Sequence, residues 1–306
     1  MSGFQIVVFL VITFVLLFYP GNSWIVHTFS QREQWKTTIK TEKLAKDPIP
    51  VVSSLQPPFV TAQGVFIADL TSFTPLLEKN SRNKFFPAST AKIVTALVVA
   101  DVFQPNDVIT VKKAITKEER PDWQLMGLVT GERITVENLL YGILVHSAND
   151  AAMILADTYG YDNFIVKMNE KAKELHMEHT HFINPDGIDE QDQLTSPYDL
   201  ALAARALLKN PYLAKFVSTK EITISDVDYT HFHRLSNVNE LLGEVNGIGG
   251  LKTGYTELAG ENLVSFYKKN GHRYILVVLK SLDRFEDTKQ LTKWIDEAIT
   301  FVPMPL

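Results

Sequence analysis

Cysteine is absent from the 306-residue sequence. Disulfide bonds and thiolate chemistry are therefore excluded, and the absence is compatible with an exported protein that avoids stray oxidation. Runs of basic residues are also absent and the formal net charge is -5, so the composition gives no reason to expect nucleic-acid binding. No internal repeat is evident. A chain of this length and composition can bury a large core, as one big domain or a domain with a small appendage.

A long apolar run occupies residues 4–19, interrupted by only two polar residues. It is short for a full membrane span of about 20 residues and long for a signal core of about 7–15. No Lys or Arg precedes it, whereas Gly21 and Ser23 place small residues at the spacing of a signal peptidase site. Residues 1–23 are interpreted as either a cleaved signal peptide or a retained membrane anchor. Either alternative predicts that the rest of the chain lies outside the cytoplasm, in the cell envelope.

Residues 24–58 are polar with four prolines near their end, and we interpret them as a linker or tether. The folded catalytic domain is predicted over residues 59–306. Its elements are expected in this order: a strand at 64–70, turn chemistry at 71–82, helical patterns at 87–102, 131–160, 161–175 and 195–209, strands at 221–224, 262–267 and 273–279, and a helix at 285–299. This order argues for an α+β fold, in which both ends of the domain form an antiparallel sheet that carries a helical block.

The most informative polar pair is Ser89 and Lys92, at the start of the helix expected over residues 87–102. Residues three apart are neighbours on one helix face, and the unpaired N–H groups of a first turn make the local potential positive. That environment and burial favour a neutral lysine amine, which can take a proton from the serine hydroxyl. Ser-x-x-Lys occurs three times in the chain, but only this copy opens a buried helix. The alternative is a polar turn that merely caps a core helix.

Two further polar segments interrupt apolar sequence. His146-Ser147-Ala148-Asn149-Asp150 lies between two apolar helical stretches, where it can face a cleft or simply cap a helix–helix turn. Lys252-Thr253-Gly254 is flanked by glycines, and glycine in a strand often marks close approach of another backbone. An ammonium and a hydroxyl beside a bare glycine would suit an extended peptide that ends in a carboxylate. The alternative for this segment is a glycine-rich turn with an exposed lysine.

Three histidines, His176, His179 and His181, have the close spacing that is typical of metal ligands. No His-Glu-x-x-His pattern accompanies them, and no carboxylate ligand is obviously placed beside them. A solvated loop is therefore the preferred interpretation, and no metal site is predicted.

Taken in order, Ser89-x-x-Lys92, Ser147-x-Asn149 and Lys252-Thr253-Gly254 resemble the three motifs of the penicillin-recognising serine enzymes. The surrounding sequence is similar to the D-alanyl-D-alanine carboxypeptidases, the low-molecular-weight penicillin-binding proteins of peptidase family S11. The similar segments are Phe86 to Lys92, His146 to Ala152, Phe182 to Gly187 and Leu251 to Thr256. The resemblance covers residues 60–300 and implies the β-lactamase/DD-peptidase type of α+β fold.

The resemblance implies a two-step acyl transfer on the D-Ala-D-Ala end of a peptidoglycan stem peptide, with no metal or organic cofactor. Ser89 would be the nucleophile, Lys92 its base, and Ser147 the relay that protonates the leaving D-alanine. The substrate would be bound by the remaining motif positions, which are Asn149, Lys252, Thr253, Gly254 and Tyr255. Backbone N–H groups of Ser89 and Tyr255 would form the oxyanion hole. β-Lactams would be covalent inhibitors.

The sequence departs from the family pattern in two places. Ala148 stands where glycine is frequent, and the chain ends soon after Thr300, without the C-terminal β-rich domain of many members. Membrane attachment would then fall to residues 1–23. Arg284 is expected near the end of the groove that holds the substrate carboxylate.

Rival functions use the same residues. An endopeptidase acting on peptide cross-links would differ only in groove shape. A class A β-lactamase needs a Glu-x-x-x-Asn segment to activate the deacylating water, and none is found between Asn149 and Lys252. A catalytically inactive wall-binding homologue would not need the intact nucleophile, lysine and Lys-Thr-Gly.

Overall fold

The computed structural model describes residues 3–18 and 48–302, which belong to two separate compact units. In the first unit, α1 (Gly3–Phe18) is an apolar helix of 16 residues. Among the described residues, no helix combines the length and hydropathy needed to cross a bilayer. Parts of the predicted leader and linker, residues 19–47, lie outside the described residues.

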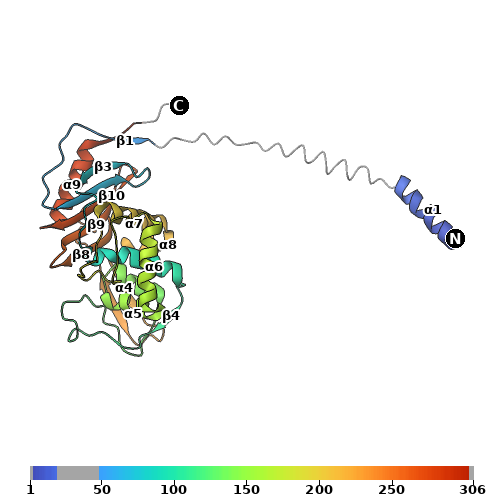
Figure 1. The fold of residues 1–306 in the computed structure, drawn as a ribbon, viewed down its shortest axis with the longest axis horizontal. Helices are drawn as coiled ribbons and strands as arrows, with labels where there is room; N and C mark the ends of the chain where they lie inside the picture. The colour runs from blue at the N-terminus through green and yellow to red at the C-terminus, as the bar shows by residue number, and fades with distance from the viewer. Residues whose placement is uncertain (1–2, 19–47, 303–306) are drawn as a thin grey trace. The chain divides into compact units, whose positions relative to one another are not determined.

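A five-stranded antiparallel sheet is the framework of the second unit, with the strand order β3-β2-β10-β9-β8 (Figure 1). Its strands, in chain order, are β2 (Gly64–Asp69), β3 (Pro75–Lys79), β8 (Ile248–Thr256), β9 (Gly260–Lys269) and β10 (His272–Ser281). Strands from both ends of the unit therefore pair in one sheet, as the sequence predicts. The Asn270-Gly271 turn joins β9 to β10 with positive φ at both residues, the conformation that favours this dipeptide in tight hairpins. Strand β8 forms one edge of this sheet.

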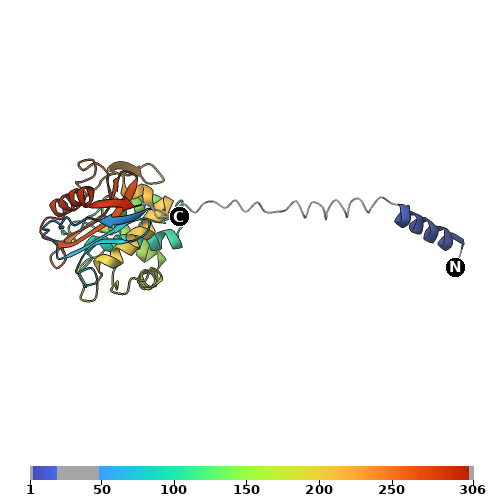
Figure 2. The same cartoon turned by 90° about the horizontal axis from the view of Figure 1, so that it is seen from above.

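One face of the sheet carries the helical block, and the other carries α9 (Arg284–Ala298), which packs on β9 and β10 (Figure 2). The block contains, in chain order, the 3₁₀ turn η1 (Ala88–Ala91), α3 (Lys92–Val102), α4 (Val136–Leu144), α5 (Asn149–Tyr159), α6 (Tyr161–Glu174), α7 (Pro197–Lys209) and α8 (Pro211–Val217). Capping side chains next to the helices determine where two of these helices begin. Thr135 accepts a hydrogen bond from the N–H of Asn138 at the start of α4, and Ser196 does the same for Asp199 in α7.

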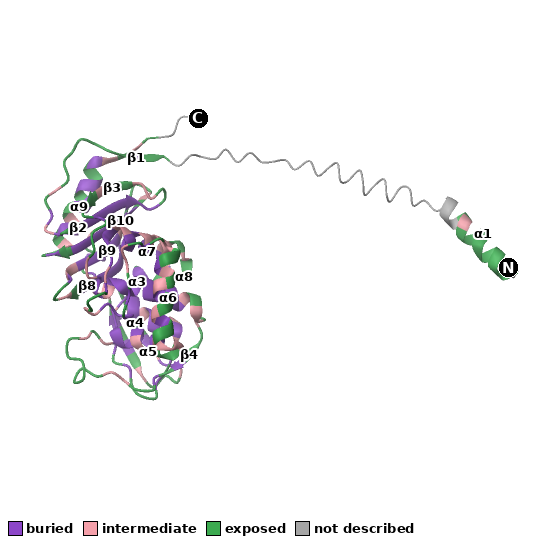
Figure 3. Ribbon diagram, viewed as in Figure 1, coloured by how far each residue is buried: buried purple, intermediate pink, exposed green. Residues whose placement is uncertain are grey.

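Two hydrophobic clusters hold these layers together, one on each face of the sheet. The larger joins the sheet to the helical block and surrounds α3, whose residues from Lys92 to Val99 are all buried. The smaller joins the opposite sheet face to α9 through Leu291, Trp294 and Ile295. Figure 3 shows the resulting band of buried residues along the central strands and α3. Helix α3 is thus a core helix, as its continuous apolar sequence predicts.

Three two-stranded ladders complete the unit. They are β1 (Ile49–Val52) with β11 (Ile299–Val302), β4 (Val108–Thr110) with β5 (Arg133–Thr135), and β6 (Glu221–Ser225) with β7 (Phe232–Ser236). Strand β1 lies inside the 24–58 range that the sequence assigns to a linker. Its partner is about 250 residues away, so nothing in its local pattern marks it as a strand.

Several expectations from the sequence need correction. Residues 71–82 contain the strand β3 as well as turns, because Leu76 packs into the smaller core cluster. A further helix, α8, follows the one predicted at 195–209, because Asn210 caps it by accepting hydrogen bonds from the N–H groups of Tyr212 and Leu213. The strand at 221–224 has a hairpin partner, β7, that the sequence analysis did not predict.

Candidate active site

The nucleophile candidate Ser89 lies in η1, directly before α3. Pro87 precedes this turn, and Ala88 adopts a φ of 47°, a left-handed conformation that is strained for a residue with a Cβ atom. The sequence analysis predicts a regular first helical turn here, whereas the structure has a 3₁₀ turn entered through a strained alanine. The serine is therefore presented by a tight turn at the end of a rigid core helix.

Lys92 is fully buried at the start of α3, and its ammonium donates three hydrogen bonds. Nζ lies 2.9 Å from Ser89 Oγ, 2.6 Å from Asn149 Oδ1 and 2.6 Å from the backbone oxygen of Asp186. Burial lowers the pKa of Lys92 to about 8, although the carboxylates of Asp186 and Asp150 oppose the shift. With that pKa, about one tenth of the amine is neutral at pH 7, and Nζ lies within hydrogen-bond reach of the serine hydroxyl.

The second motif forms the connection between α4 and α5, as the sequence predicts. Ser147 is buried with a φ of 64°, and Asn149 is the first residue of α5. The backbone N–H of Asn149 donates to Gln124 O at 2.7 Å, and the Asp150 carboxylate accepts hydrogen bonds from the N–H groups of residues 126–128. The α4–α5 connection is therefore fastened to the loop before β5, and Asn149 directly contacts Lys92.

The Asn184-to-Asp189 loop also belongs to the site, which the sequence analysis noted only as a family-like segment. The backbone oxygen of Asp186 accepts a hydrogen bond from Lys92 Nζ. The Asp186 carboxyl is buried, and desolvation raises its pKa. A Cβ atom on Gly187 would lie 1.8 Å from Ala88 O, so only glycine lets the loop approach the nucleophile turn. Asp189 accepts hydrogen bonds from Thr256 Oγ1 and from the N–H of Leu258, at the end of β8. This loop therefore connects Lys92 to the edge strand.

The third motif lies on the edge strand β8, where Lys252 and Thr253 are buried and Tyr255 is exposed. Lys252 Nζ donates to Thr253 O at 2.8 Å, and in the described part of the chain no carboxylate lies within salt-bridge distance of it. Burial, together with the positive charges of Lys92 and Arg284, lowers the pKa of Lys252 well below its usual value. Lys252 therefore lies in the positive field of Lys92 and Arg284, with no carboxylate of the described residues paired to it.

Gly254 makes room for the nucleophile turn. A Cβ atom at this position would lie 3.0 Å from both Ala88 Cβ and the Ser89 nitrogen. The family resemblance implies that Gly254 lets a substrate peptide lie against the strand, and in the structure the position of its missing Cβ atom faces η1. The close approach of another backbone, which glycine in a strand indicates, is here an approach by the protein's own chain.

Two further residues complete the surroundings of Gly254 and the turn. Arg284, at the start of α9, donates from Nη1 to Gly254 O at 2.9 Å. Asn262, on β9, donates from Nδ2 to Phe86 O and Pro87 O. The sequence analysis placed Arg284 near the carboxylate end of the groove but missed Asn262, for which a single sequence gives no signal.

The three histidines considered as metal ligands follow α6. His179 lies 3.7 Å from the carboxylate of Asp199, and His181 Nδ1 lies 3.1 Å from Asp192 O. Within residues 3–18 and 48–302, no group of three or more His, Cys, Asp or Glu side chains is arranged to hold a metal ion.

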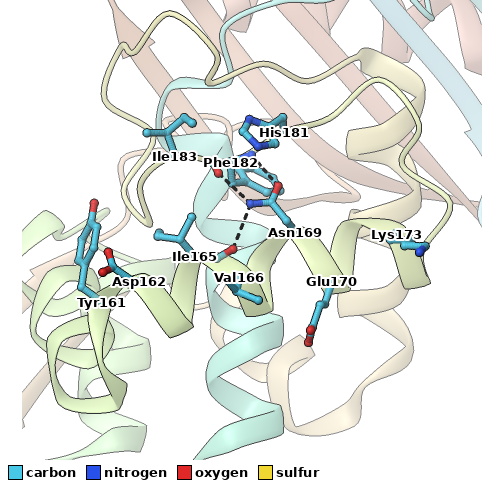
Figure 4. A pocket seen from close by; sticks show the side chains of 10 residues that line it. All are labelled: Tyr161, Asp162, Ile165, Val166, Asn169, Glu170, Lys173, His181, Phe182 and Ile183. Carbon is cyan, nitrogen blue, oxygen red and sulfur yellow. Dashed lines mark hydrogen bonds between the residues drawn. The ribbon is translucent and has the colours of Figure 1, made fainter.

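An open groove with a volume of about 520 Å³ lies elsewhere on the molecule. It runs along α6 from Tyr161 to Lys173, and residues 181–183 form its other wall (Figure 4). The side chain of Asn169 joins the two walls through hydrogen bonds to Ile165 O and Phe182 O. None of the motif residues lines this groove.

Comparisons with known proteins identify the family to which this sequence is similar. A family model described as D-alanyl-D-alanine carboxypeptidase, peptidase S11, matches residues 51–282. The chain is 35% identical over 229 residues to D-alanyl-D-alanine carboxypeptidase DacF of Bacillus subtilis, covering 74% of this chain and 59% of the relative. It is 32% identical over 264 residues to DacD of Escherichia coli, covering 81% of this chain and 66% of the relative. The chain therefore spans about three fifths to two thirds of these curated relatives.

Solved structures give the same fold. A DD-transpeptidase from Streptomyces matches with a TM-score of 0.74 at 30% identity, covering 78% of this chain and 98% of that one. A D-alanyl-D-alanine carboxypeptidase from Mycobacterium tuberculosis matches with a TM-score of 0.73 at 28% identity, covering 82% and 99%. The predicted α+β architecture of the DD-peptidase type is confirmed.

Proposed function

Because the chain belongs to the D-alanyl-D-alanine carboxypeptidase family, peptidase S11, we propose that it is a serine-type D-Ala-D-Ala carboxypeptidase. It removes the terminal D-alanine of peptidoglycan stem peptides through an acyl-enzyme on Ser89. One observation carries the proposal: a buried lysine with a pKa of about 8 lies 2.9 Å from the hydroxyl of a serine in a strained, rigidly held turn. That arrangement activates a nucleophile.

In the first step, neutral Lys92 takes the proton of the Ser89 hydroxyl as Oγ attacks the carbonyl carbon between the two alanines. The backbone N–H groups of Ser89 and Tyr255 stabilise the oxyanion, and each such donor typically contributes about 3–4 kcal/mol to lowering the barrier. The C–N bond then breaks, and the departing amine of D-alanine receives a proton through Ser147. The products are free D-alanine and an ester of Ser89.

Substrate binding uses the edge of the sheet. An extended peptide can pair with β8 as an added strand, which is a common mode of peptide recognition. Lys252 and Thr253 bind the terminal carboxylate, assisted by the positive charge of Arg284, and the bound anion in turn favours the charged form of Lys252. Asn149 Oδ1 orients Lys92, and the asparagine side chain also bonds the substrate amide.

Water completes the cycle by hydrolysing the acyl-enzyme. The chain lacks the Glu-x-x-x-Asn segment that class A β-lactamases use to activate that water, so a penicilloyl ester on Ser89 is slow to hydrolyse. β-Lactams are therefore covalent inhibitors in this proposal. The enzyme works in the cell envelope, with residues 1–23 as signal peptide or membrane anchor, residues 24–58 as the tether and residues 59–306 as the catalytic domain.

The experiment is incubation of the full chain with a fluorescent penicillin, followed by peptide mapping, and assay of D-alanine release from a peptide ending in D-Ala-D-Ala. We expect a stable adduct on Ser89 and release of one D-alanine per peptide. An adduct on any other residue, or no D-alanine release by a protein that labels, contradicts the proposal. Rapid loss of the drug without a stable adduct indicates a β-lactamase, and neither labelling nor turnover indicates an inactive wall-binding homologue.

A second reaction is favoured by the likeness to the Streptomyces DD-transpeptidase. In that reaction, an amine takes the place of water as acceptor of the same acyl group. Adding glycine to the peptide assay separates the two outcomes, because transpeptidation converts part of the acyl-enzyme into a glycyl peptide. Cross-linked dimer peptides test the endopeptidase alternative in the same assay.

A further inference from the structure

Asn262 is a fully buried side chain on β9 that binds the backbone of the nucleophile turn. Its Nδ2 donates to Phe86 O at 2.9 Å and to Pro87 O at 3.1 Å. These carbonyls belong to the two residues directly before Ala88, whose φ of 47° is strained. A strained conformation persists only where its surroundings hold it, and Asn262 supplies two of the hydrogen bonds that do so.

A bulge in the sheet fixes the orientation of this amide. The register of β9 and β10 shifts between Val278 and Ser281, which leaves the N–H of Lys280 outside the regular ladder. That N–H donates to Asn262 Oδ1 at 2.8 Å. Because Lys280 offers a donor, the asparagine must present its oxygen to the bulge, and its NH₂ group then faces the nucleophile turn.

Asn262 works beside Gly254. The two residues are directly opposite each other in the β8–β9 ladder, so their side-chain positions lie on the same sheet face. Gly254 lets that face come within 3.0 Å of the Ser89 nitrogen, measured from the Cβ position that glycine leaves empty. Two neighbouring positions on β8 and β9 therefore accommodate the turn. Gly254 leaves room for it, and the Asn262 amide hydrogen-bonds to its backbone.

We infer that Asn262 is a positioning residue for the acylation step. Its amide holds the Phe86–Ser89 backbone so that the hydroxyl and N–H of Ser89 both face the reacting carbonyl. It touches no substrate atom and acts only through the turn. This inference rests on the proposed function of Ser89.

The test is the variant Asn262→Asp in the full chain. Aspartate has the same shape and keeps an acceptor for the N–H of Lys280, but it turns a second oxygen toward Phe86 O and Pro87 O. Stopped-flow labelling with a fluorescent penicillin separates the reversible binding constant from the acylation rate constant. We expect the acylation rate constant to fall by about tenfold or more. The binding constant should change by less than about twofold, since the carboxylate-binding cations are untouched.

Ser265→Ala is the matched control. Ser265 is buried on the same strand, and its hydroxyl has no hydrogen-bond partner among the described residues. Its removal should leave both constants at wild-type values. All rates are expressed per folded molecule, from the folded fraction measured by tryptophan fluorescence at the assay temperature.

The outcomes are distinct. An Asn262→Asp protein that is folded and acylates at the wild-type rate overturns the inference, and so does an equal loss in binding and acylation. If this variant does not fold, Asn262→Ala is measured in the cold. If neither variant folds, Asn262 has a role in folding alone, and the inference is overturned. If the wild-type chain itself forms no adduct on Ser89, the proposed function has failed rather than the role of Asn262.

Discussion

Asp186 and Asp287 are both buried carboxyl groups, but their surroundings are opposite. Asp287, on α9, accepts four hydrogen bonds, from the N–H and hydroxyl of Thr61, the N–H of Ala62 and the hydroxyl of Ser281. Asp186, beside Lys92, has one oxygen without a partner among the described residues, and desolvation raises its pKa. A fully satisfied carboxylate fastens elements together, whereas burial without full hydrogen bonding disfavours the charged form of the other carboxyl.

The same contrast separates the middle of α9 from the edge strand β8. On α9, Asp287 joins residues 61 and 62 to the last helix and completes its own hydrogen bonding. At β8, Lys252 bonds only a backbone oxygen, and Arg284, which binds Gly254 from the start of α9, keeps its Nε without a partner in the described part of the chain. Incomplete pairing of buried polar groups costs stability. Among the described residues, such groups lie near Lys92, at Asp186, and beside β8, at Arg284, and also elsewhere in the fold, as at Tyr212 and Asn239.

Replacing Ser89 with alanine should separate function from stability most completely. We expect D-alanine release and penicillin labelling to fall by about 10³-fold or more. The thermal midpoint should stay close to that of the wild type, because no core contact is lost. Steady-state kinetics and calorimetry measure the two quantities. Retained turnover would remove Ser89 from the role of nucleophile.

Replacing Asp287 with alanine should have the opposite effect. Four donors lose their acceptor at once, so we expect the free energy of unfolding to fall by about 2–4 kcal/mol, with acylation of Ser89 preserved in the molecules that remain folded. Urea unfolding monitored by tryptophan fluorescence measures the change. The control is Asp296→Ala on the same helix, a partly exposed carboxylate that pairs with Tyr267 and Lys269. Its loss should cost less than about 1 kcal/mol, and equal losses at both positions would contradict the comparison.

The smallest expected effect is a pH dependence. Burial lowers the pKa of Lys92 to about 8, and the base must be neutral to accept the serine proton. The second-order rate constant of acylation should therefore rise about tenfold per pH unit below that value and level off above it. Lys252→Arg serves as the control, because arginine does not titrate in this range, and the rising limb should remain. A flat profile between about pH 6 and about pH 9 would exclude Lys92 as the base.

Much of this architecture follows from local sequence patterns. The continuous apolar residues after Lys92 predict a core helix, Thr135 predicts the start of another helix, and Asn270-Gly271 predicts the β9–β10 hairpin. The contact between Ser89 and Lys92 also follows from their spacing. These features depend on residues that are close together in the chain.

The remainder depends on pairs that no local pattern reveals. Asp186 reaches Lys92 across 94 residues, and Asn262 reaches Phe86 across 176. Strand β1 becomes a strand only because β11 offers it a partner. The 3₁₀ turn at Ala88 likewise packs against two distant segments, which contain Gly187 and Gly254. A single sequence contains these residues but does not show which of them are in contact.

The β1–β11 ladder also determines how the folded unit responds to mechanical load. Ile49 is paired with Val302, so the chain enters and leaves this unit at one point. Tension applied across the two ends would load that pair first, then Pro50 with Phe301, and would open the ladder one residue pair at a time. Such unzipping needs little force, because only the outermost hydrogen bonds resist at any moment. This short ladder would therefore yield before the five-stranded sheet and the motif residues on β8.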